Sequence, residues 1–137
     1  MHVPAFWWRK PGLRAGLLAP LAGIYGAVAA RRLARTGQRA GVPVLCVGNF
    51  TLGGTGKTPT AMVLAALLTE MGERVCFLSR GYGGSHAEPK LVAGKDDPAQ
   101  VGDEPLLLAR VAPTIVARDR AAGADLARSQ GASVIVT

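Results

Sequence analysis

The sequence predicts an α/β fold in which a parallel sheet is covered by helices on both faces. Short apolar runs that are typical of buried strands alternate with longer segments of helical periodicity. A glycine-rich segment with a lysine and a threonine, residues 53–59, lies where the first apolar run gives way to a helical pattern. The 137 residues, 49% of them hydrophobic, suffice for one domain with a core. We therefore expect an α/β domain over residues 41–137, preceded by a separate arm over residues 1–40.

The arm is basic and apolar. Residues 1–40 contain seven Lys and Arg and no acidic residue, whereas residues 41–137 contain nine basic and nine acidic residues. The basic residues of the arm lie among Leu, Ile, Ala and Trp, which favours an anionic lipid surface over nucleic acid as its partner. Residues 6–8, Phe-Trp-Trp, resemble an aromatic anchor at the level of the lipid headgroups.

A helix is expected to begin at Pro20, because proline is tolerated best in a first helical turn. One apolar face and a basic C-terminal end would then consist of Leu21, Ile24, Tyr25 and Val28, and of Arg31, Arg32 and Arg35. An interfacial helix is the favoured interpretation. A spanning or re-entrant helix, a secretory signal peptide cut near residues 27–29, and a helix that packs on a core are the alternatives. Export would carry the glycine-rich segment 53–59, whose composition suits a nucleotide site, away from the cellular ATP pool, which argues against a signal peptide.

The run 42–47 has the length of a buried strand, and the glycine-rich loop after it predicts a phosphate site. In such a loop backbone N–H groups surround the phosphates, Lys57 reaches the outer phosphates and the Thr58 hydroxyl ligates Mg²⁺. The following helix presents the positive end of its dipole to the same anion. The strict pattern has glycine where this chain has Thr51, and a glycine turn with an unrelated lysine is the alternative. The expected ATP-binding residues are Thr51, Leu52, Gly53, Gly54, Thr55, Gly56, Lys57 and Thr58.

The next helix is expected over residues 57–71, ended by Gly72. Its apolar side would consist of Met62, Leu64, Leu67, Leu68 and Met71. A second buried strand, 75–78, opens into a glycine loop at 79–84, which lies at the sheet edge where open α/β folds bind ligands, unless it is a simple turn. Cys46 and Cys76 are predicted to be buried in the first two strands, without a disulfide or a metal. His2 and His86 are expected to be ordinary surface residues.

Residues 90–137 show the same alternation of strand-like apolar runs and helical segments. A minor strand at 90–93 and a polar turn at 94–100 precede a helix that Asp103 caps. Its core candidates are Leu106, Leu107, Leu108 and Val111. Strands at 114–117 and 133–137 flank a helix at 121–129, and Asp119 is expected to form an ion pair or to cap that helix. Phosphoryl transfer needs a second acidic magnesium ligand, usually after a neighbouring strand. None follows 133–137, so we expect the front part of a nucleotide-dependent enzyme.

Four segments together resemble one family. They are 47–59 (VGNFTLGGTGKTP), 78–84 (LSRGYGG), 101–105 (VGDEP) and 117–120 (ARDR), and the N-terminal stretch over residues 6–8 and 18–26 is also similar. The order and content of these motifs resemble the N-terminal portion of the tetraacyldisaccharide 4'-kinase (lipid A 4'-kinase) family. That family also lacks the leading glycine of the strict phosphate loop.

The resemblance implies a P-loop NTPase-like kinase at the cytoplasmic face of the Gram-negative inner membrane. It would use ATP and Mg²⁺ to phosphorylate the 4' hydroxyl of tetraacyldisaccharide 1-phosphate in lipid A biosynthesis. By similarity, Lys57 and Thr58 hold phosphate and Mg²⁺, and Asp103 is the base that acts on the sugar hydroxyl. Arg80 and Tyr82 would lie near the substrate. The family continues with an Asp-Asp-Gly motif and a second half with a catalytic histidine, neither of which is in this sequence.

Two other functions fit the residues. One is a membrane-associated P-loop NTPase that switches a partner, although no Asn-Lys-x-Asp motif for guanine is present. The other is a catalytically inert fragment that binds nucleotide or membrane. Without the resemblance, Asp103 would be read as a helix cap alone. Neither nucleic acid nor a protein partner is implied.

Overall fold

The structure is a computed structural model that describes residues 12–34, 36–48, 56–86 and 88–137. The chain divides into two compact units, residues 1–37 and residues 38–137. Each unit is described by itself below.

In the described part of the first unit, residues Leu13–Leu33 form the long helix α1. The expected start at Pro20 is wrong, since Pro20 lies inside the helix. Leucine and alanine, which are strong helix formers, stand on both sides of Pro20 and carry the helix through it, although proline removes one backbone hydrogen bond. Within the described residues, no helix combines the length and the apolarity that crossing a membrane requires.

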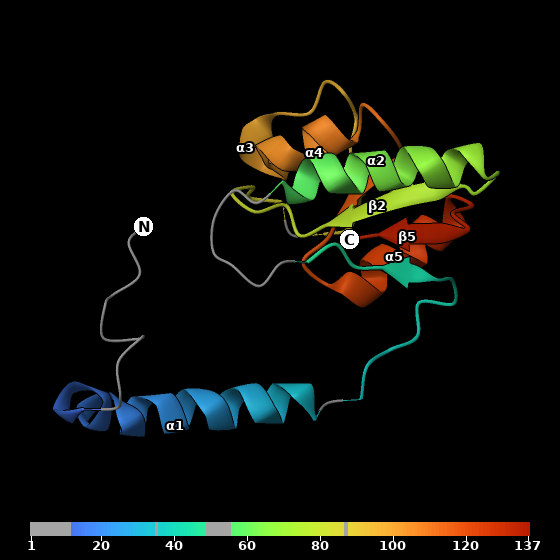
Figure 1. Cartoon of the computed structure of the whole chain (residues 1–137). Helices are drawn as coiled ribbons and strands as arrows, with labels where there is room; N and C mark the ends of the chain where they lie inside the picture. Colours follow the sequence, from blue (N-terminus) through green and yellow to red (C-terminus); the bar gives the residue numbers. More distant parts are fainter. Residues whose placement is uncertain (1–11, 35, 49–55, 87) are drawn as a thin grey trace. The chain divides into compact units, whose positions relative to one another are not determined.

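The second unit is built on a five-stranded sheet with the order β1-β5-β2-β4-β3. Figure 1 shows β2 and β5 side by side in this sheet. The strands are β1 (Val44–Leu45), β2 (Val75–Ser79), β3 (Lys90–Leu91), β4 (Thr114–Val116) and β5 (Val134–Val136). The pairs β1–β5, β5–β2 and β2–β4 are parallel, whereas β3 runs antiparallel to β4. The expectation of a purely parallel sheet is therefore corrected to a mixed, mostly parallel one. β3 lies in the connection between β2 and β4 and pairs with β4 at the edge of the sheet, antiparallel to it.

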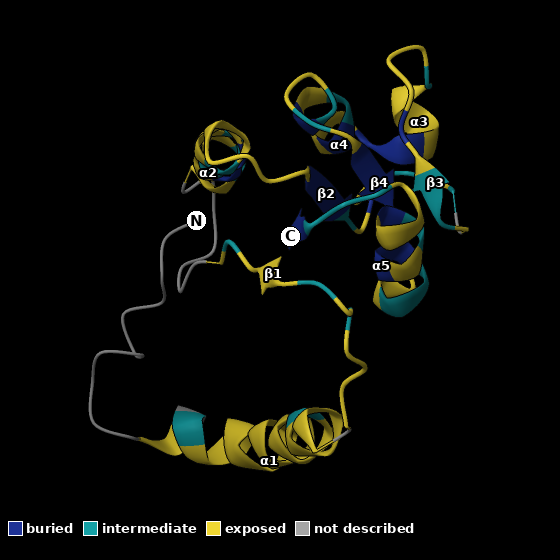
Figure 2. Ribbon diagram, turned by 90° about the vertical axis from the view of Figure 1, so that its right-hand side faces the viewer, coloured by how far each residue is buried: buried dark blue, intermediate teal, exposed yellow. Residues whose placement is uncertain are grey.

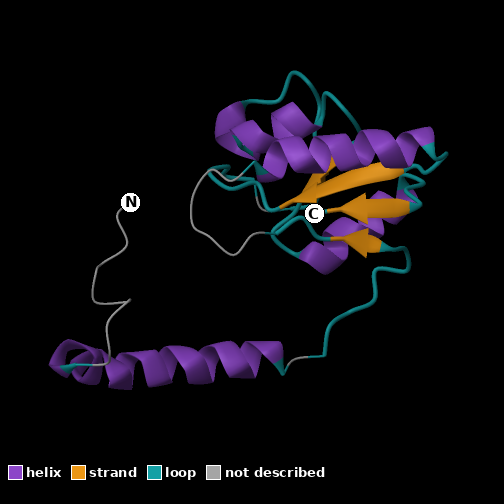
Figure 3. Cartoon of the chain, viewed as in Figure 1, coloured by secondary structure: helices purple, strands orange, loops and turns teal. Residues whose placement is uncertain are grey.

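Helices cover both faces of this sheet (Figures 1 and 3). They are α2 (Lys57–Glu70), α3 (Pro98–Val101), α4 (Asp103–Leu108) and α5 (Arg120–Ser129). Successive residues of β2 point to opposite faces, as in any strand. Phe77 packs with Ala61 and Ala65 of α2 and with Leu108 of α4, whereas Cys76 and Leu78 belong to the core under α5.

The first strand differs from its prediction. Residues 42–47 were expected to form a buried strand, but the strand β1 consists of Val44 and Leu45 alone, and both are exposed (Figure 2). Cys46 is exposed as well, so its predicted burial is wrong, whereas Cys76 is buried. The reason is the position of β1 at the sheet edge, where β5 is its one pairing strand. An apolar run predicts a strand, but it does not show whether that strand lies in the middle of the sheet or at its edge.

Two helix faces also differ from their predictions. In α2 the buried residues are Ala61 and Ala65, and Leu67 and Met71 are exposed. Because alanine is small, the alanine face of α2 can lie close to the sheet. Part of the predicted apolar face, including Leu67, then points away from the sheet. In α4, Leu108 is buried and Leu106 packs beside the core, but Leu107 is exposed. Val111, which lies beyond the end of α4, is exposed as well. Three consecutive residues of a helix point in different directions, so Leu106, Leu107 and Leu108 cannot all face the core.

The segment before α4 is more ordered than expected. The polar turn predicted at 94–100 contains α3, which begins after Asp97, whose side chain accepts a hydrogen bond from the Ala99 N–H. Asp103 does not cap α4, because Gly102 is the N-cap residue and Asp103 is the first helical residue. The Gly102 backbone, with φ +87° and ψ 159°, makes the sharp corner between α3 and α4. His86, expected at the surface, is half-buried, and its backbone N–H donates to the Gln100 carbonyl.

Candidate functional site

The start of α2 has the properties of an anion site. Gly56 is the N-cap residue in the left-handed conformation, with φ +77°, and no side chain caps the helix among the described residues. Lys57 and Thr58 are the first two helical residues, so their backbone N–H groups belong to the first turn, which is the end of a helix that attracts anions. The helix dipole adds positive potential at the same place. Residues 51–55 of the predicted loop lie outside the described residues.

A cavity of about 290 Å³ opens beside this helix start, at the carboxyl ends of β1, β5 and β2. The strand ends are held in register, because the Val47 N–H donates to the Thr137 carbonyl over 2.8 Å and the Thr137 N–H donates to the Leu45 carbonyl over 2.9 Å. The polar residues that line the cavity are Lys57, Thr58, Ser79, Arg80, Tyr82, Glu104, Arg120 and Thr137. Lys57, Thr58, Arg80 and Tyr82 are therefore brought together at one edge of the sheet.

The loop 79–84 is packed rather than open. A Cβ atom at Gly81, where φ is +68°, would lie 2.4 Å from Val116 Cγ1, and one at Gly84 would lie 2.3 Å from the Gln100 carbonyl oxygen. The Gly81 N–H donates to Ser79 Oγ over 3.2 Å, and the Ser85 N–H donates to the Ala99 carbonyl over 3.1 Å. Glycine lets the backbone lie against β4 and α3, so the loop presents the exposed Arg80 and Tyr82 side chains from a fixed base.

Sequence reasoning missed one acidic residue of the cavity. The Thr58 hydroxyl donates a 2.7 Å hydrogen bond to Glu104 Oε1. The predicted base, Asp103, is exposed at the start of α4 and does not line this cavity, whereas Glu104 does. Adjacent residues of a helix point about 100° apart, so one Asp-Glu pair at a helix start aims two carboxylates in different directions. The Gly-Asp-Glu-Pro motif places two acidic residues at this helix start, but it does not show which of the two carboxylates faces Thr58.

The residues present fit a nucleotide with a magnesium ion. Lys57, Arg80 and Arg120 carry positive charge of the kind that suits phosphates, and the helix start presents backbone N–H groups as directed donors. Among the described residues no group of three His, Cys, Asp or Glu is placed to hold a metal. Mg²⁺ does not need such a group, because it usually takes one or two protein oxygens and completes its shell with phosphates and water.

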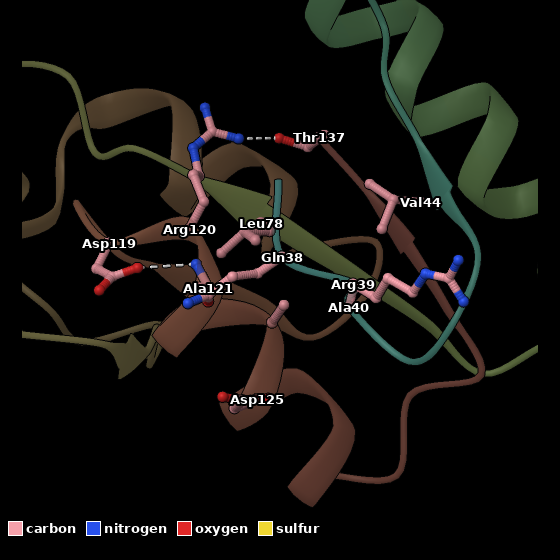
Figure 4. A pocket seen from close by; sticks show the side chains of 11 residues that line it. Gln38, Arg39, Ala40, Val44, Leu78, Asp119, Arg120, Ala121, Asp125 and Thr137 are labelled. Carbon is pink, nitrogen blue, oxygen red and sulfur yellow. Dashed lines mark hydrogen bonds between the residues drawn. The ribbon is translucent and has the colours of Figure 1, made fainter. Parts of the chain in front are cut away.

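A larger cavity, of about 680 Å³, lies on the α5 side of the sheet (Figure 4). Arg39, Val44, Asp119 and Asp125 are among its lining residues. Asp119 caps α5, since its Oδ1 accepts hydrogen bonds from the Ala121 N–H at 2.9 Å and the Ala122 N–H at 3.3 Å, and the capping role expected for Asp119 is confirmed.

Arg120 lines both cavities. Its guanidinium donates a hydrogen bond to the Thr137 hydroxyl, which places it across the carboxyl end of β5 (Figure 4).

Comparison with known proteins gives a consistent result. The family described as LpxK, tetraacyldisaccharide-1-P 4'-kinase, matches residues 14–137. Two curated relatives named tetraacyldisaccharide 4'-kinase, from Rhodopseudomonas palustris (strain BisB18) and Methylobacterium sp. (strain 4-46), are 60% and 62% identical to this chain. The alignments cover 99% of this chain but 40% and 42% of those relatives. The chain thus spans about two fifths of their length.

A solved structure agrees with the fold. A crystal structure of LpxK from Aquifex aeolicus in complex with ATP superposes with a TM-score of 0.74 at 32% identity. The match covers 88% of this chain and 42% of that one. From the shared motifs, the family match over residues 14–137 and these likenesses, the chain belongs to the tetraacyldisaccharide 4'-kinase family.

Proposed function

We propose that this chain is the ATP-binding, N-terminal part of a kinase that phosphorylates the 4' hydroxyl of tetraacyldisaccharide 1-phosphate in lipid A biosynthesis. The observation that carries the proposal is the convergence of Lys57 and Thr58 with the loop of Arg80 and Tyr82 in one cavity at the carboxyl ends of parallel strands. The family to which the chain belongs supports the same assignment.

The phosphate site consists of residues 51–58. The backbone N–H groups at the start of α2 bind phosphate oxygens, and Lys57 neutralises the outer phosphates. The Thr58 hydroxyl oxygen would hold Mg²⁺. Bound Mg·ATP supplies the transferable phosphoryl group and spreads its charge. The ATP in the Aquifex aeolicus LpxK structure supports this choice of nucleotide.

The acceptor site lies on the side of Arg80, Tyr82 and Asp103. A sugar hydroxyl holds its proton tightly, so a carboxylate that accepts the proton during transfer assists the reaction. Asp103 is exposed at the corner between α3 and α4 and takes this role in the proposal. Arg80 supplies a positive charge that suits the phosphate of the acceptor, and Tyr82, with 94% of its surface exposed, supplies an aromatic ring and a hydroxyl.

The arm places this chemistry at the cytoplasmic face of the inner membrane, as a peripheral rather than a spanning element. The bulky apolar side chains of α1, among them Leu17, Leu21 and Ile24, are exposed, and Arg31 and Arg32 stand in its last turn. In an anionic lipid surface the apolar side chains of α1 can insert among the acyl chains, and its arginines can pair with the negatively charged headgroups.

A chimeric enzyme tests the proposal, because this chain covers about 40% of its relatives. Residues 1–137 would be joined to the remainder of the Rhodopseudomonas palustris relative, and phosphate transfer from ATP to tetraacyldisaccharide 1-phosphate measured in detergent micelles. We expect transfer by the chimera, and its loss on Lys57→Ala or Asp103→Asn. A folded chimera that binds ATP but transfers nothing would favour a nucleotide-binding switch. A chimera that binds no ATP would point to an inert fragment.

A further inference from the structure

The outer edge of β1 is open in the α/β unit. On the inner side, backbone groups of Pro43, Leu45 and Val47 form hydrogen bonds of 2.8–3.0 Å with β5. The backbone groups of successive strand residues point to opposite sides, so Val44 and Cys46 direct theirs away from β5. Within the described residues, no strand pairs with β1 on that side. The N–H and C=O groups of Val44 and Cys46 can therefore accept a further strand.

This edge lacks the protection that edge strands usually have. Lysine, proline or a bulge commonly prevents one sheet edge from pairing with another. Residues 42–48 contain no charged residue. Their one proline, Pro43, directs its backbone toward β5, so it removes no donor from the outer side. The strand at the opposite edge, β3, begins with Lys90, which forms an ion pair with Asp96.

The outward groups of β1 match those of a second copy. An antiparallel strand related by a two-fold axis at Leu45 places Val44 opposite Cys46 of the second copy. These two residues then direct their N–H and C=O groups toward each other, as a hydrogen-bonded antiparallel pair requires. Leu45 faces Leu45 of the second copy at the non-hydrogen-bonded position, where side chains lie closest. Val44 and Leu45 are 46% and 38% exposed, so both have apolar surface left for this contact.

The charges beside the edge also permit two copies to meet. The cavity of about 680 Å³ on the α5 side is lined by Val44 of β1 and by four charged residues, Arg39, Asp119, Arg120 and Asp125 (Figure 4). Two of these side chains are basic and two are acidic. A surface with balanced charge does not repel a second copy of itself, whereas a surface of one sign does.

We propose that the chain forms a two-fold dimer in which the β1 strands of two copies pair antiparallel and join their sheets into one. The contact uses the same surface in both copies and is therefore closed. Hydrogen bonds to β5 already order the backbone of β1, which lowers the entropy cost of adding a strand to it. This inference goes beyond the proposed function and does not depend on it, because it rests on the sheet edge alone.

Sedimentation velocity of the full chain over a concentration series is the first test. We expect the wild type to dimerise and Leu45→Lys to weaken association by about tenfold or more, since two like charges would lie directly opposite each other. Val44→Pro should weaken it as well, because it removes one outward N–H from each copy and none that β5 uses. Leu107→Lys is the matched control: Leu107 is 45% exposed on α4, and this variant should associate as the wild type does.

A cross-link tests the register. In a Cys46→Ser background, Leu45→Cys places two thiols opposite each other at the non-hydrogen-bonded position. The Cα atoms of such a pair lie about 4.5 Å apart, within the range that a disulfide spans. Oxidation should therefore give a covalent dimer on a non-reducing gel. Leu107→Cys in the same background is the control and should remain monomeric, and the buried Cys76 should not react in the folded chain.

Three results would overturn the dimer. One is a wild-type chain that stays monomeric at every concentration, which would leave the edge to a segment of the longer relatives. Another is association that neither edge variant weakens, since the apolar arm would then make the contact. The third is a folded Leu45→Cys chain that cross-links no faster than Leu107→Cys. Circular dichroism checks the fold of each variant, and the cross-link decides if Leu45→Lys and Val44→Pro do not fold.

Discussion

Gly102 lies against the backbone of Tyr82. A Cβ atom at position 102 would come within 2.7 Å of the Tyr82 carbonyl oxygen, and the backbone there has φ +87° and ψ 159°. This region of backbone conformation is open to glycine almost alone. The contact joins the corner that begins α4, with Asp103 and Glu104, to the loop that carries Arg80 and Tyr82.

Gly102→Ala should destabilise the α/β unit. Backbone strain and overlap with the Tyr82 carbonyl should each act, so we expect a loss of about 1–3 kcal/mol in the free energy of unfolding. Urea denaturation followed by circular dichroism measures it. Gly94→Ala is the matched control, because Gly94 has nothing within 4 Å of an added Cβ. Equal stabilities for the two variants would show that the corner is not held as described.

Asp96 should make stability depend on pH. Its Oδ1 accepts a 2.8 Å bond from Lys90 Nζ and its Oδ2 a 2.9 Å bond from the Ala93 N–H. The hydrogen bond from Lys90, together with that of Ala93, lowers the pKa of Asp96 below its usual value. The stability from Asp96 is therefore present above the unfolded-state pKa and is lost as the pH falls through the folded-state pKa.

Asp96→Asn should accordingly be less stable than wild type at neutral pH, with the gap closing in acid. Urea titrations over a pH series measure the gap. A Lys90→Met background should shrink the gap at neutral pH, because the first cause of the shift is then gone. A gap that stays constant from neutral pH to strong acid contradicts the assignment.

The two cysteines should differ sharply in reactivity. Burial raises the pKa of the Cys76 thiol to about 11, whereas Cys46 is exposed. Since the thiolate is the reactive form, Ellman's reagent should modify Cys46 at once in the folded chain and Cys76 only when the chain unfolds. Cys46→Ser should remove the fast phase. Two equal fast phases in the native chain would contradict the buried position of Cys76.

The arm should bind anionic vesicles through its arginines. Each basic residue near such a surface contributes about 1 kcal/mol, so Arg31→Gln with Arg32→Gln should lower the partition coefficient of the full chain roughly 30-fold. Co-sedimentation with phosphatidylglycerol vesicles measures it, and Arg110→Gln, outside the arm, is the control. Equal partition into zwitterionic and anionic vesicles would contradict a role for these charges.

Much of the α/β unit could be predicted from local patterns. The strands at 75–78, 114–117 and 133–137 appear within a residue or two of their predicted ends, because each is a short apolar run buried in the sheet. Helix α2 was predicted over 57–71 and spans Lys57–Glu70, since glycines mark both its ends. Local chemistry sufficed for these elements.

Features that depend on distant parts of the chain were not predictable. The edge position of β1 and the reversed direction of β3 are set by the order in which strands assemble, which no window of sequence contains. The site shows the same limit. Lys57 and Thr58 followed from one contiguous motif, but the partner of Thr58 is Glu104, 46 residues along the chain. Tertiary packing of α4 on α2 makes that pair.

The central claim is that the start of α2 binds the phosphates of ATP, and titration calorimetry of ATP into the full chain tests it most directly. We predict saturable binding by the wild type and a loss of about tenfold or more on Lys57→Ala, since a hydrogen bond to a charged group contributes about 1.5–3 kcal/mol. No binding by the wild type, or equal affinity in the two proteins, would contradict the account.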